Sequence, residues 1–475
     1  MNPLVIAPVA VPLAAAALYA VFGWRRGTAW LGALAAAGLL ACAIALAVVG
    51  DTGAGPLRAD ALSAYMLIVI GAVALLAMLA GPAYLAAEQA GHRAMRRYGV
   101  LTQMFIAAMA LAVLASSLGM LWVAIEATTI LTAFLVGHRR TRQATEAAWK
   151  YVVICSVGIA LALLGIVLLH YAGAHVGVSS LDWAALSQHA ARLDPGVTRL
   201  AIVLLVLGFG TKAGLAPLHA WLPDAHSQAP APVSALMSGV LLSVAFYAIL
   251  RIKVISDGAL GVGFARLLLV IVALASLAVA ALLLIGQRDY KRMLAYSSIE
   301  HMGVVALGAA IGGPLALAAV LLHILGHGLG KSVLFLSSGH LLHASGSSAI
   351  DAVRGLAARA PLLAGVFGLG LMALLGLPPF SLFASEVGIA RAGLAAGLGW
   401  PVAVALLLML IIVAAVGRHA RGMILGERQG EAIAVPPTAA TALVAGLAAC
   451  ALLGITTGPL RSLLQAAAAV AGGTP

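Results

Sequence analysis

One apolar stretch of the chain, residues 201–223, reads AIVLLVLGFGTKAGLAPLHAWLP and holds a single lysine, Lys212. A charge at the centre of a bilayer costs at least about 2.5 kcal/mol, so a lysine kept within an apolar run needs a reason. Gly214 and Pro217 follow it closely, and residues of these two types interrupt helices. The stretch therefore predicts a membrane-spanning helix that is broken beside a buried charge.

The composition of the whole chain is typical of a membrane protein. Of its 475 residues, 63% are hydrophobic and 9% are charged, whereas soluble domains carry about 25% charged residues. Lipid offers no hydrogen-bond partners, so a spanning segment must be a helix or part of a closed barrel, and the long apolar runs here lack the alternation of barrel strands. We predict an all-α polytopic membrane protein.

Counting about 20 apolar residues per span gives about 14 transmembrane helices. The predicted spans are residues 3–22, 29–49, 61–85, 99–117, 118–137, 149–171, 198–219, 230–252, 264–286, 296–313, 314–342, 361–392, 400–421 and 436–458. The seventh span holds the break near Pro217, and the twelfth is interrupted in the same way around Gly376, Pro378 and Pro379.

Broken helices at corresponding places in two halves of a chain are typical of inverted repeats with an ion site between them. We therefore predict two inverted five-helix repeats, helices 4 to 8 and helices 9 to 13. The predicted regions are residues 1–98 with the first three helices, 99–253 with the first repeat, 254–430 with the second repeat, and 431–475 with helix 14 and the tail.

The basic residues indicate membrane topology rather than a nucleic-acid partner. The net charge is +12, but Lys and Arg occur in small groups between apolar runs and form no single patch. Most of them follow odd-numbered helices, as do Arg25, Arg26, Arg139 and Arg140. Since cytoplasmic connections carry the excess of Lys and Arg, both termini are predicted on the non-cytoplasmic side of a bacterial-type inner membrane.

Four charged residues lie away from the ends of the predicted spans: Glu126, Lys212, Lys331 and Glu386. Each could belong to a structural ion pair or reach the membrane surface from a helix end. The alternative is transport, because burial disfavours the charged form of a lysine while a nearby glutamate favours it. A glutamate whose influence on Lys212 changes would switch the lysine between holding and releasing a proton. We predict that all four residues take part in proton translocation.

Histidines add a polar stripe to one predicted helix. His323, His327 and Lys331 are spaced four residues apart, which places them within about 80° of one helix face. We call these three residues the histidine stripe. Histidine has an ordinary pKa near 6.5 and therefore suits proton relay, although hydrogen bonds to neighbouring backbone would also explain buried histidines.

Four further polar residues lie near predicted helix ends: His219, His226, Glu300 and His301. There, a solvated or capping role explains a polar residue as well as transport does. We include His219, which lies in the broken seventh helix, among the candidates for proton translocation.

The sequence contains no pattern for a cofactor or a metal. Residues 326–332, GHGLGKS, resemble a phosphate-binding loop but have Leu325 where the pattern GxxxxGK[ST] needs glycine. Cys42, Cys155 and Cys450 stand alone within apolar runs, without the spacing of a metal or iron–sulfur site. We expect neither cofactor nor metal, and no redox or hydrolytic centre, in this chain.

The residues around the seventh helix resemble a known family. The stretch KAGLAPLHAWLPDAHSQAP, residues 212–230, is similar to the signature of the antiporter-like subunits of respiratory complex I and of multisubunit cation/proton antiporters. The resemblance covers about helices 3 to 13. It implies that Glu126 is the fifth-helix glutamate that modulates Lys212, and that Glu386 is the twelfth-helix residue from which the proton leaves.

Two shorter stretches narrow the resemblance. SSIEHMG, residues 297–303, and HGLGKSVLFLSSG, residues 327–339, are most similar to the counterpart subunit of energy-converting membrane-bound nickel–iron hydrogenases, including the formate hydrogenlyase group. Complex I members usually have a lysine on the eighth helix, where this chain has Ser243. With this departure, we expect water and the histidine stripe to connect Lys212 to Glu386.

The resemblance implies a proton-translocating membrane subunit of a complex I-like oxidoreductase, and a hydrogenase-type complex is the main hypothesis. Redox chemistry would then occur in other membrane and peripheral subunits. One alternative is a subunit of a sodium/proton antiporter without a redox partner; others are a subunit of an NADH–quinone oxidoreductase or of a complex for inorganic-carbon uptake. The expected partners are such subunits, the lipid bilayer, and protons or sodium, and no nucleic acid.

Overall fold

The computed structural model describes residues 2–88, 91–426 and 432–473. Helices make up most of this part of the chain. The strands within it, β1 (Thr52–Ala54) and β2 (Leu57–Ala59), form one short antiparallel hairpin. The prediction of an all-α polytopic protein is confirmed.

The described residues form helices that follow one another in chain order. They are α1 (Ala7–Phe22), α2 (Leu31–Val49), α3 (Ala61–Ala87), α4 (His92–Leu114), α5 (Leu118–Val136), α6 (Arg142–Ala174), α7 (Trp183–Gln188), α8 (Pro195–Lys212), α9 (Trp221–Gln228), α10 (Ala231–Leu236), α11 (Leu242–Leu260), α12 (Val262–Ile285), α13 (Tyr290–Ile311), α14 (Gly313–Ser345), α15 (Leu356–Arg359), α16 (Pro361–Leu374), α17 (Ser381–Ala395), α18 (Gly399–Ile424), α19 (Pro437–Ile455) and α20 (Arg461–Ala471). A π-helical turn, η5 (Met237–Leu241), joins α10 to α11.

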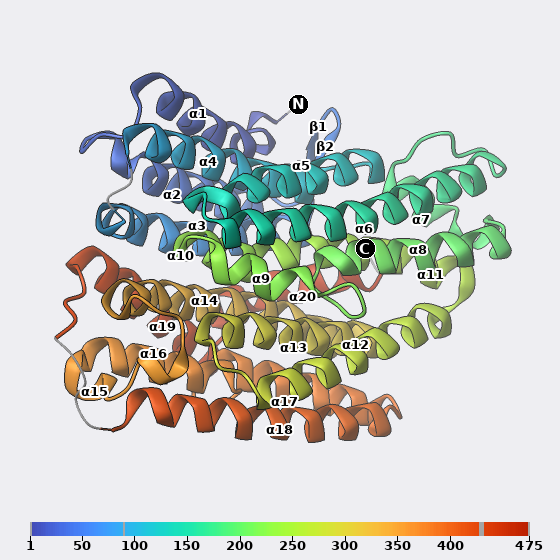
Figure 1. Ribbon diagram of the computed structural model, residues 1–475. Coiled ribbons are helices and arrows are strands. Elements are labelled where there is room, and N and C mark those ends of the chain that lie inside the picture. The colour runs from blue at the N-terminus through green and yellow to red at the C-terminus, as the bar shows by residue number, and fades with distance from the viewer. Residues whose placement is uncertain (1, 89–90, 427–431, 474–475) are drawn as a thin grey trace.

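Within the described residues, 12 helical segments are long and apolar enough to cross a membrane, and α1 and α16 are shorter apolar helices. Each of these segments corresponds to one of the predicted spans. The helices run side by side, with α15 at one end of the bundle and α7 near the other (Figure 1). The direction of the bundle is therefore the direction in which the chain crosses the membrane.

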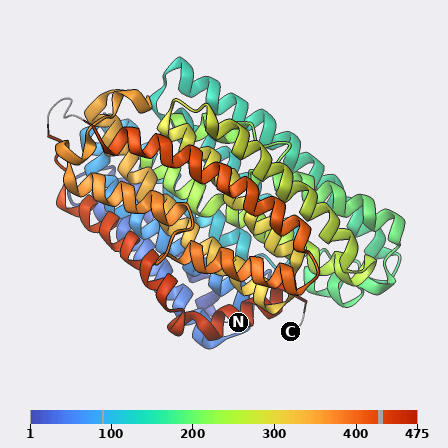
Figure 2. The same ribbon diagram turned by 90° about the horizontal axis from the view of Figure 1, so that it is seen from below.

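The centre of the bundle and its outer surface differ in burial. The most apolar 18 residues of α14 are all buried, whereas only 33% of the corresponding window of α18 is. Figure 1 places α14 between the N-terminal helices and α18, and Figure 2 looks onto the orange-red α18 from outside. The exposed leucines of α18, among them Leu406, Leu407 and Leu410, suit contact with lipid.

The start of α13 differs from the prediction. The tenth span was expected at 296–313, but the helix begins at Tyr290. Lys291 is buried, and its Nζ donates hydrogen bonds to the carbonyl oxygens of Ser227 and Ala229, at 2.8 and 3.0 Å. This charge is therefore satisfied inside the protein and does not mark the membrane surface. As a consequence, Glu300 and His301 lie in the middle of α13 and not near its end.

The predicted region boundaries do not all fall in connections. Helix α4 continues across the boundary at 98/99, and α11 continues across the boundary at 253/254. The boundary at 430/431 lies outside the described residues. The division into two inverted repeats stays a prediction.

The first predicted helix break is present. Residues 198–219 were expected as one interrupted span, but the helix α8 ends at Lys212 and α9 begins at Trp221. Gly214 lies between them with a φ of 76°, a backbone conformation that glycine adopts at little cost. Pro217 lies in the same non-helical segment, where its missing N–H costs no helical hydrogen bond.

The second predicted break divides the span expected at 361–392. Helix α16 ends at Leu374, and α17 begins at Ser381. Gly376 has a φ of 62°, and Pro378 and Pro379 follow it between the two helices. Both breaks thus combine a glycine in the left-handed region with proline, and the prolines at both breaks are exposed.

Two elements, η5 and α14, meet backbone to backbone, with a side chain of α3 beside them. A Cβ atom on Gly239, in η5, would lie 3.0 Å from the carbonyl oxygen of Gly328 on α14 and 3.1 Å from Val73 of α3. A Cβ atom on Gly328 would lie 2.9 Å from the carbonyl oxygen of Gly239. Only glycine fits at both positions without displacing a neighbour, so these two residues set the separation of η5 and α14.

Candidate functional site

Lys212 is fully buried at the last position of α8. Its Nζ donates a hydrogen bond of 2.7 Å to the hydroxyl oxygen of Tyr151 on α6. It also lies 4.8 Å from the ring centroid of Tyr151 and 5.9 Å from that of Trp221, within the range of cation–π attraction. The C-terminal end of a helix carries partial negative charge and therefore favours an ammonium at this position.

Hydroxyl groups extend from Lys212 toward α5. The Tyr151 hydroxyl lies 2.6 Å from Thr132 Oγ1, which lies 2.6 Å from the carbonyl oxygen of Thr128. Because the Thr132 hydrogen is directed to that carbonyl, Tyr151 donates to Thr132 and accepts from Lys212. On the same helix, Thr129 Oγ1 donates to Glu126 Oε2 at 3.1 Å. We call Glu126, Tyr151, Thr132 and Lys212 the hydroxyl cluster.

Glu126 itself is half-buried and is not hydrogen-bonded to Lys212. The two residues still interact electrostatically across the hydroxyl groups that lie between them. Sequence analysis found the two charged members of the cluster but missed Tyr151 and Thr132. A tyrosine or threonine in an apolar run gives no signal of its own, because both are common in packed helix interfaces.

The close packing of α6 and α8 holds Lys212 against Tyr151. A Cβ atom on Gly158 of α6 would lie 2.5 Å from Thr211 of α8, and one on Gly208 would lie 2.6 Å from the carbonyl oxygen of Gly158. Small residues at helix contacts allow backbones to approach in a membrane protein, where lipid provides no hydrophobic drive for association. The glycines therefore position the lysine as much as its direct partners do.

A second polar group joins α13, α14 and α17. His301 Nδ1 lies 3.1 Å from His323 Nε2, and His323 Nδ1 lies 2.9 Å from Ser385 Oγ. Ser385 also donates to the carbonyl oxygen of Leu382 at 2.8 Å, so it accepts from His323. The hydrogen bonds thus assign the hydrogen of His323 to Nδ1 and direct the His301 Nδ1–H toward His323.

His301 lies between two members of the histidine stripe. Its ring centroid is 5.1 Å from that of His323 and 5.0 Å from that of His327. Among the described residues, His301 Nε2 and His327 Nε2 are buried without a hydrogen-bond partner. The predicted stripe is therefore present on α14, but a residue of α13 joins its two histidines.

Lys331, the third member of the stripe, is fully buried. Its Nζ donates to the carbonyl oxygen of Leu294 at 2.6 Å and to Ser297 Oγ at 2.5 Å. The ammonium also interacts electrostatically with Glu300, which is 2% exposed. All three partners come from α13, and Leu294 lies before the predicted start of that helix.

Glu386 is half-buried in the second turn of α17 and lies against the second helix break. A Cβ atom on Gly376 would lie 2.8 Å from the Cδ atom of this glutamate. Glu386 also lines a small cavity of about 20 Å³, enough for about one water molecule. The carboxylate therefore occupies a position that only glycine at 376 leaves open.

The ligand atoms of His301, His323 and Glu386 lie within 4.8 Å of one another. Three such groups could hold a metal ion, but the existing hydrogen bond between the two histidines would also suit proton transfer. We call Glu300, His301, Ser385, Glu386 and the histidine stripe the imidazole cluster.

A polar opening lies at the end of the bundle where α6 and α13 begin. A cavity of about 380 Å³ is lined by Asp224, Ser227 and other polar residues at the start of α6 and α13. His226, between those two residues, is fully buried, stacks on Phe335 at 5.0 Å and has no hydrogen-bond partner for either ring nitrogen among the described residues. His226 thus lies behind the cavity, and Phe335 follows Lys331 by one helical turn.

Two sequence-predicted features are not joined to either cluster. His219 lies half-buried between α8 and α9, and no hydrogen bond among the described residues connects it to Lys212 or Glu126. Ser243 is buried in α11, and its hydroxyl has no partner within the described part of the chain. The expected relay between Lys212 and Glu386 therefore stays a prediction over this middle section.

Comparison with known families identifies the architecture. The family model described as NADH:quinone oxidoreductase/Mrp antiporter, transmembrane, matches residues 115–413, a range that includes both polar clusters. The chain belongs to this family. The expected kinship with the antiporter-like subunits of complex I and of multisubunit antiporters is confirmed.

Relatives in this antiporter-like family include hydrogenase components. The Hydrogenase-4 component F homolog of Methylacidiphilum infernorum is 39% identical over 334 residues, which cover 69% of this chain and 70% of that relative. Hydrogenase-4 component B of Escherichia coli is 32% identical over 344 residues, which cover 70% of this chain and 50% of the relative. The chain thus spans about half the length of the second relative, and it is close to hydrogenase counterparts.

Solved structures extend the likeness to nearly the whole chain. A chain of the archaeal membrane-bound sulfane sulfur reductase superposes with a TM-score of 0.88 at 24% identity. The match covers 99% of this chain and 97% of the reductase chain. A chain of Thermus thermophilus respiratory complex I gives 0.83 at 24% identity, covering 99% of both. A chain of the Mrp complex of a Dietzia species gives 0.88 at 23% identity, covering 99% and 98%. The fold is that of an antiporter-like subunit.

Proposed function

We propose that this antiporter-like chain is a proton-translocating membrane subunit of a complex I-like oxidoreductase of the membrane-bound hydrogenase type. The observation that carries the proposal is the fully buried ammonium of Lys212 at a helix break, hydrogen-bonded through Tyr151 toward α5. A charge that is costly in a membrane is typical of an ion pathway. The hydrogenase-4 relatives favour the hydrogenase type of complex.

The chemistry follows from the charge balance at Lys212. Burial disfavours its ammonium form, and the anionic form of Glu126 favours it. When the influence of Glu126 is strong, the lysine holds a proton; when that influence weakens, the lysine releases it toward the imidazole cluster. Imidazoles accept and release protons with small changes in environment, and Glu386 passes the proton out beside α17.

Redox chemistry is assigned to other membrane and peripheral subunits, and no redox cofactor to this chain. The complex resides in a bacterial-type inner membrane, with both termini on the non-cytoplasmic side. The polar cavity at Asp224 and Ser227 then opens on the cytoplasmic side, the side on which most of the basic connections lie. His226, behind that cavity, is suited to receive a proton from water.

Replacement of Lys212 tests the proposal. Lys212→Met is expected to abolish proton uptake into inverted membrane vesicles that hold the native complex, while membrane assembly stays largely intact. The measurement is a pH-sensitive dye during redox turnover, with assembly checked by the subunits that co-purify. The matched control is Lys253→Met, which removes a lysine paired with Asp257 on α11, outside both clusters. Wild-type pumping in the Lys212 variant would refute the assigned role.

A sodium/proton antiporter subunit without a redox partner is the second candidate. The Mrp complex chain matches at a TM-score of 0.88, as high as that of the sulfane sulfur reductase chain. The subunits that co-purify with the native protein discriminate between the two. Nickel–iron and ferredoxin-like subunits would support the main proposal, and a set of small antiporter subunits alone would support the second.

A further inference from the structure

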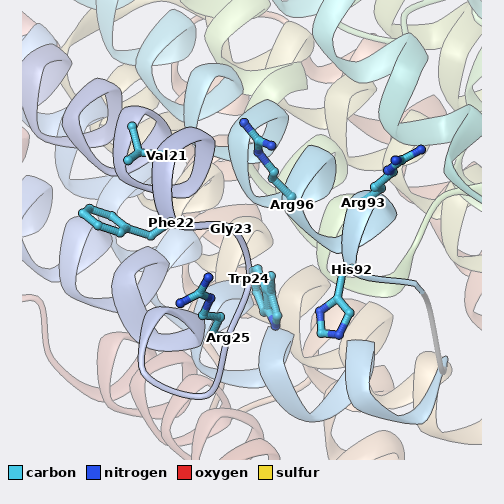
Figure 3. Close-up of a pocket in the computed structure, with 8 residues that line it drawn as sticks. All are labelled: Val21, Phe22, Gly23, Trp24, Arg25, His92, Arg93 and Arg96. Carbon is cyan, nitrogen blue, oxygen red and sulfur yellow. The ribbon is translucent and has the colours of Figure 1, made fainter.

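A surface cavity outside both polar clusters lies where α1 ends and α4 begins. It has a volume of about 470 Å³, within the size range of ligand pockets. Its lining comes from two segments, Val21–Arg25 and the first turns of α4 with His92, Arg93 and Arg96 (Figure 3). Gly23, with a φ of 69°, ends α1 and turns the chain so that Trp24 and Arg25 lie beside α4.

The charge of this cavity is strongly one-sided. Among its lining residues are three arginines and a histidine, and none is acidic. Residues 1–50 contain no Asp or Glu. Glu88, an acid close in sequence to α4, is already bound, because it accepts from Arg139 at 2.6 Å and from Tyr84 at 2.8 Å. The cavity therefore favours an anion that comes from outside the chain.

Apolar groups lie directly beside the basic ones. Val21 is 74% exposed and Phe22 is 52% exposed at the end of α1. Trp24 is held in place, because it stacks on Tyr19 with ring centroids 5.3 Å apart and meets the edge of Tyr98 at 6.2 Å. A fixed tryptophan between exposed apolar side chains and arginines is typical of the level at which lipid headgroups meet acyl chains.

We propose that this cavity binds the headgroup of an anionic phospholipid. Arg25 and Arg93 are exposed on different sides of the cavity and point away from each other (Figure 3), so their long, flexible side chains would turn toward the bound phosphate. Arg96 holds α4 to α1 by donating to the carbonyl oxygen of Ala20. The acyl chains run along Val21 and Phe22. A free phosphate ion would use the arginines alone and would leave the exposed apolar pair unexplained.

The test uses the full-length chain in phosphatidylcholine vesicles that contain a minor fraction of photoactivatable phosphatidylglycerol. We expect cross-links on the peptides around residues 21–25 and 92–96. Each basic residue near a membrane surface contributes about 1 kcal/mol to the binding of anionic lipid, so the double variant R25Q/R93Q is expected to bind about thirtyfold more weakly. If that variant fails to fold, R93Q alone should show about a fivefold loss.

The matched control is R142Q/R288Q, which removes two exposed arginines from the same predicted membrane side, outside the cavity. In this control variant, the lipid should cross-link to the peptides around residues 21–25 and 92–96 to the same extent as in the wild type. Equal labelling by photoactivatable phosphatidylcholine, or undiminished labelling in R25Q/R93Q, would overturn the proposal. Displacement of the cross-linked lipid by inorganic phosphate would reveal a site for a free anion. Labelling that is lost only in the native complex would reveal a partner subunit over the cavity. Either result rejects lipid as the ligand.

Discussion

The two helix breaks use opposite charges at opposite helix ends. Lys212 is the last residue of α8, just before the first break, whereas Glu386 lies in the second turn of α17, after the second break. A helix favours cations at its C-terminal end and anions near its N-terminal end. Each break therefore creates a helix end whose partial charge suits the residue placed beside it.

The surroundings of the two residues differ more than their positions do. Lys212 contacts the hydroxyl of Tyr151, which leads to Thr132, while the imidazole cluster joins two hydrogen-bonded histidines to Ser385 beside Glu386. Hydroxyl groups reorient and pass hydrogen bonds on, but histidine also changes charge near neutral pH. In the proposed function, this difference would let the first cluster hold a proton on its lysine and the second pass a proton along several groups.

Among the substitutions that compare the two breaks, we predict the largest loss of proton translocation when the charge at the second break is removed. Glu386→Gln keeps the shape of the side chain but cannot accept a proton. We expect proton translocation to fall about 100-fold, in the range of a lost acid–base group. The measurement is dye-monitored proton uptake in inverted vesicles, and Asp51→Asn, which changes an exposed acid outside both clusters and outside the polar cavity, is the control. Retention of more than half of the wild-type rate would mean that protons leave elsewhere.

At the first break, the tyrosine hydroxyl is the sharper target. Tyr151→Phe removes one hydrogen bond to a charged group, which contributes about 1.5 kcal/mol, so we expect proton uptake to slow about tenfold. Tyr247→Phe is the matched control, because this buried tyrosine bonds to Val113 and Ser63 outside both clusters. If the two variants slow uptake equally, the Tyr151 hydroxyl acts through packing and not through Lys212.

The smallest expected effect concerns the glycine beneath Glu386. Gly376→Ala and Gly397→Ala both place a Cβ atom on a residue of positive φ, at 62° and 73°, and each should lower the free energy of unfolding by about 1–2 kcal/mol. Only at Gly376 would the Cβ meet Glu386; at Gly397 nothing lies within 4 Å. We therefore expect a severalfold slower proton uptake in the first variant alone, with thermal unfolding as the stability measurement. Equal proton uptake in both variants would mean that the contact between Gly376 and Glu386 does not matter for transport.

The sequence allowed the main features of this arrangement to be predicted. Glycine, proline and a charge within apolar runs located both breaks, and the four-residue spacing located the histidine stripe on one helix. Such patterns are local, and the physical reason for each lies within a few residues of the chain. The correct start of α13 could not be predicted from the local sequence. The reason is that the hydrogen bonds of Lys291 go to carbonyl groups of Ser227 and Ala229, on a distant segment.

The partners of the charged residues could not be predicted for the same reason. His301 and Glu300 were placed near a helix end, although His301 contacts His323 on another helix. Tyr151 carries no charge, so only its contact with Lys212 distinguishes it from a packing residue. His219 and the division into inverted repeats stay predictions, since no contact among the described residues tests them.

The meeting of Gly239 and Gly328 has a mechanical consequence. At this point η5 and α14 touch through their backbones, with no flexible side chain between them to absorb displacement. A shift of α14 along its axis would push directly on the turn that leads into α11, and the reverse holds as well. Motion of α14, which carries the histidine stripe, is therefore passed to η5 through a rigid joint instead of being lost in side-chain rotation.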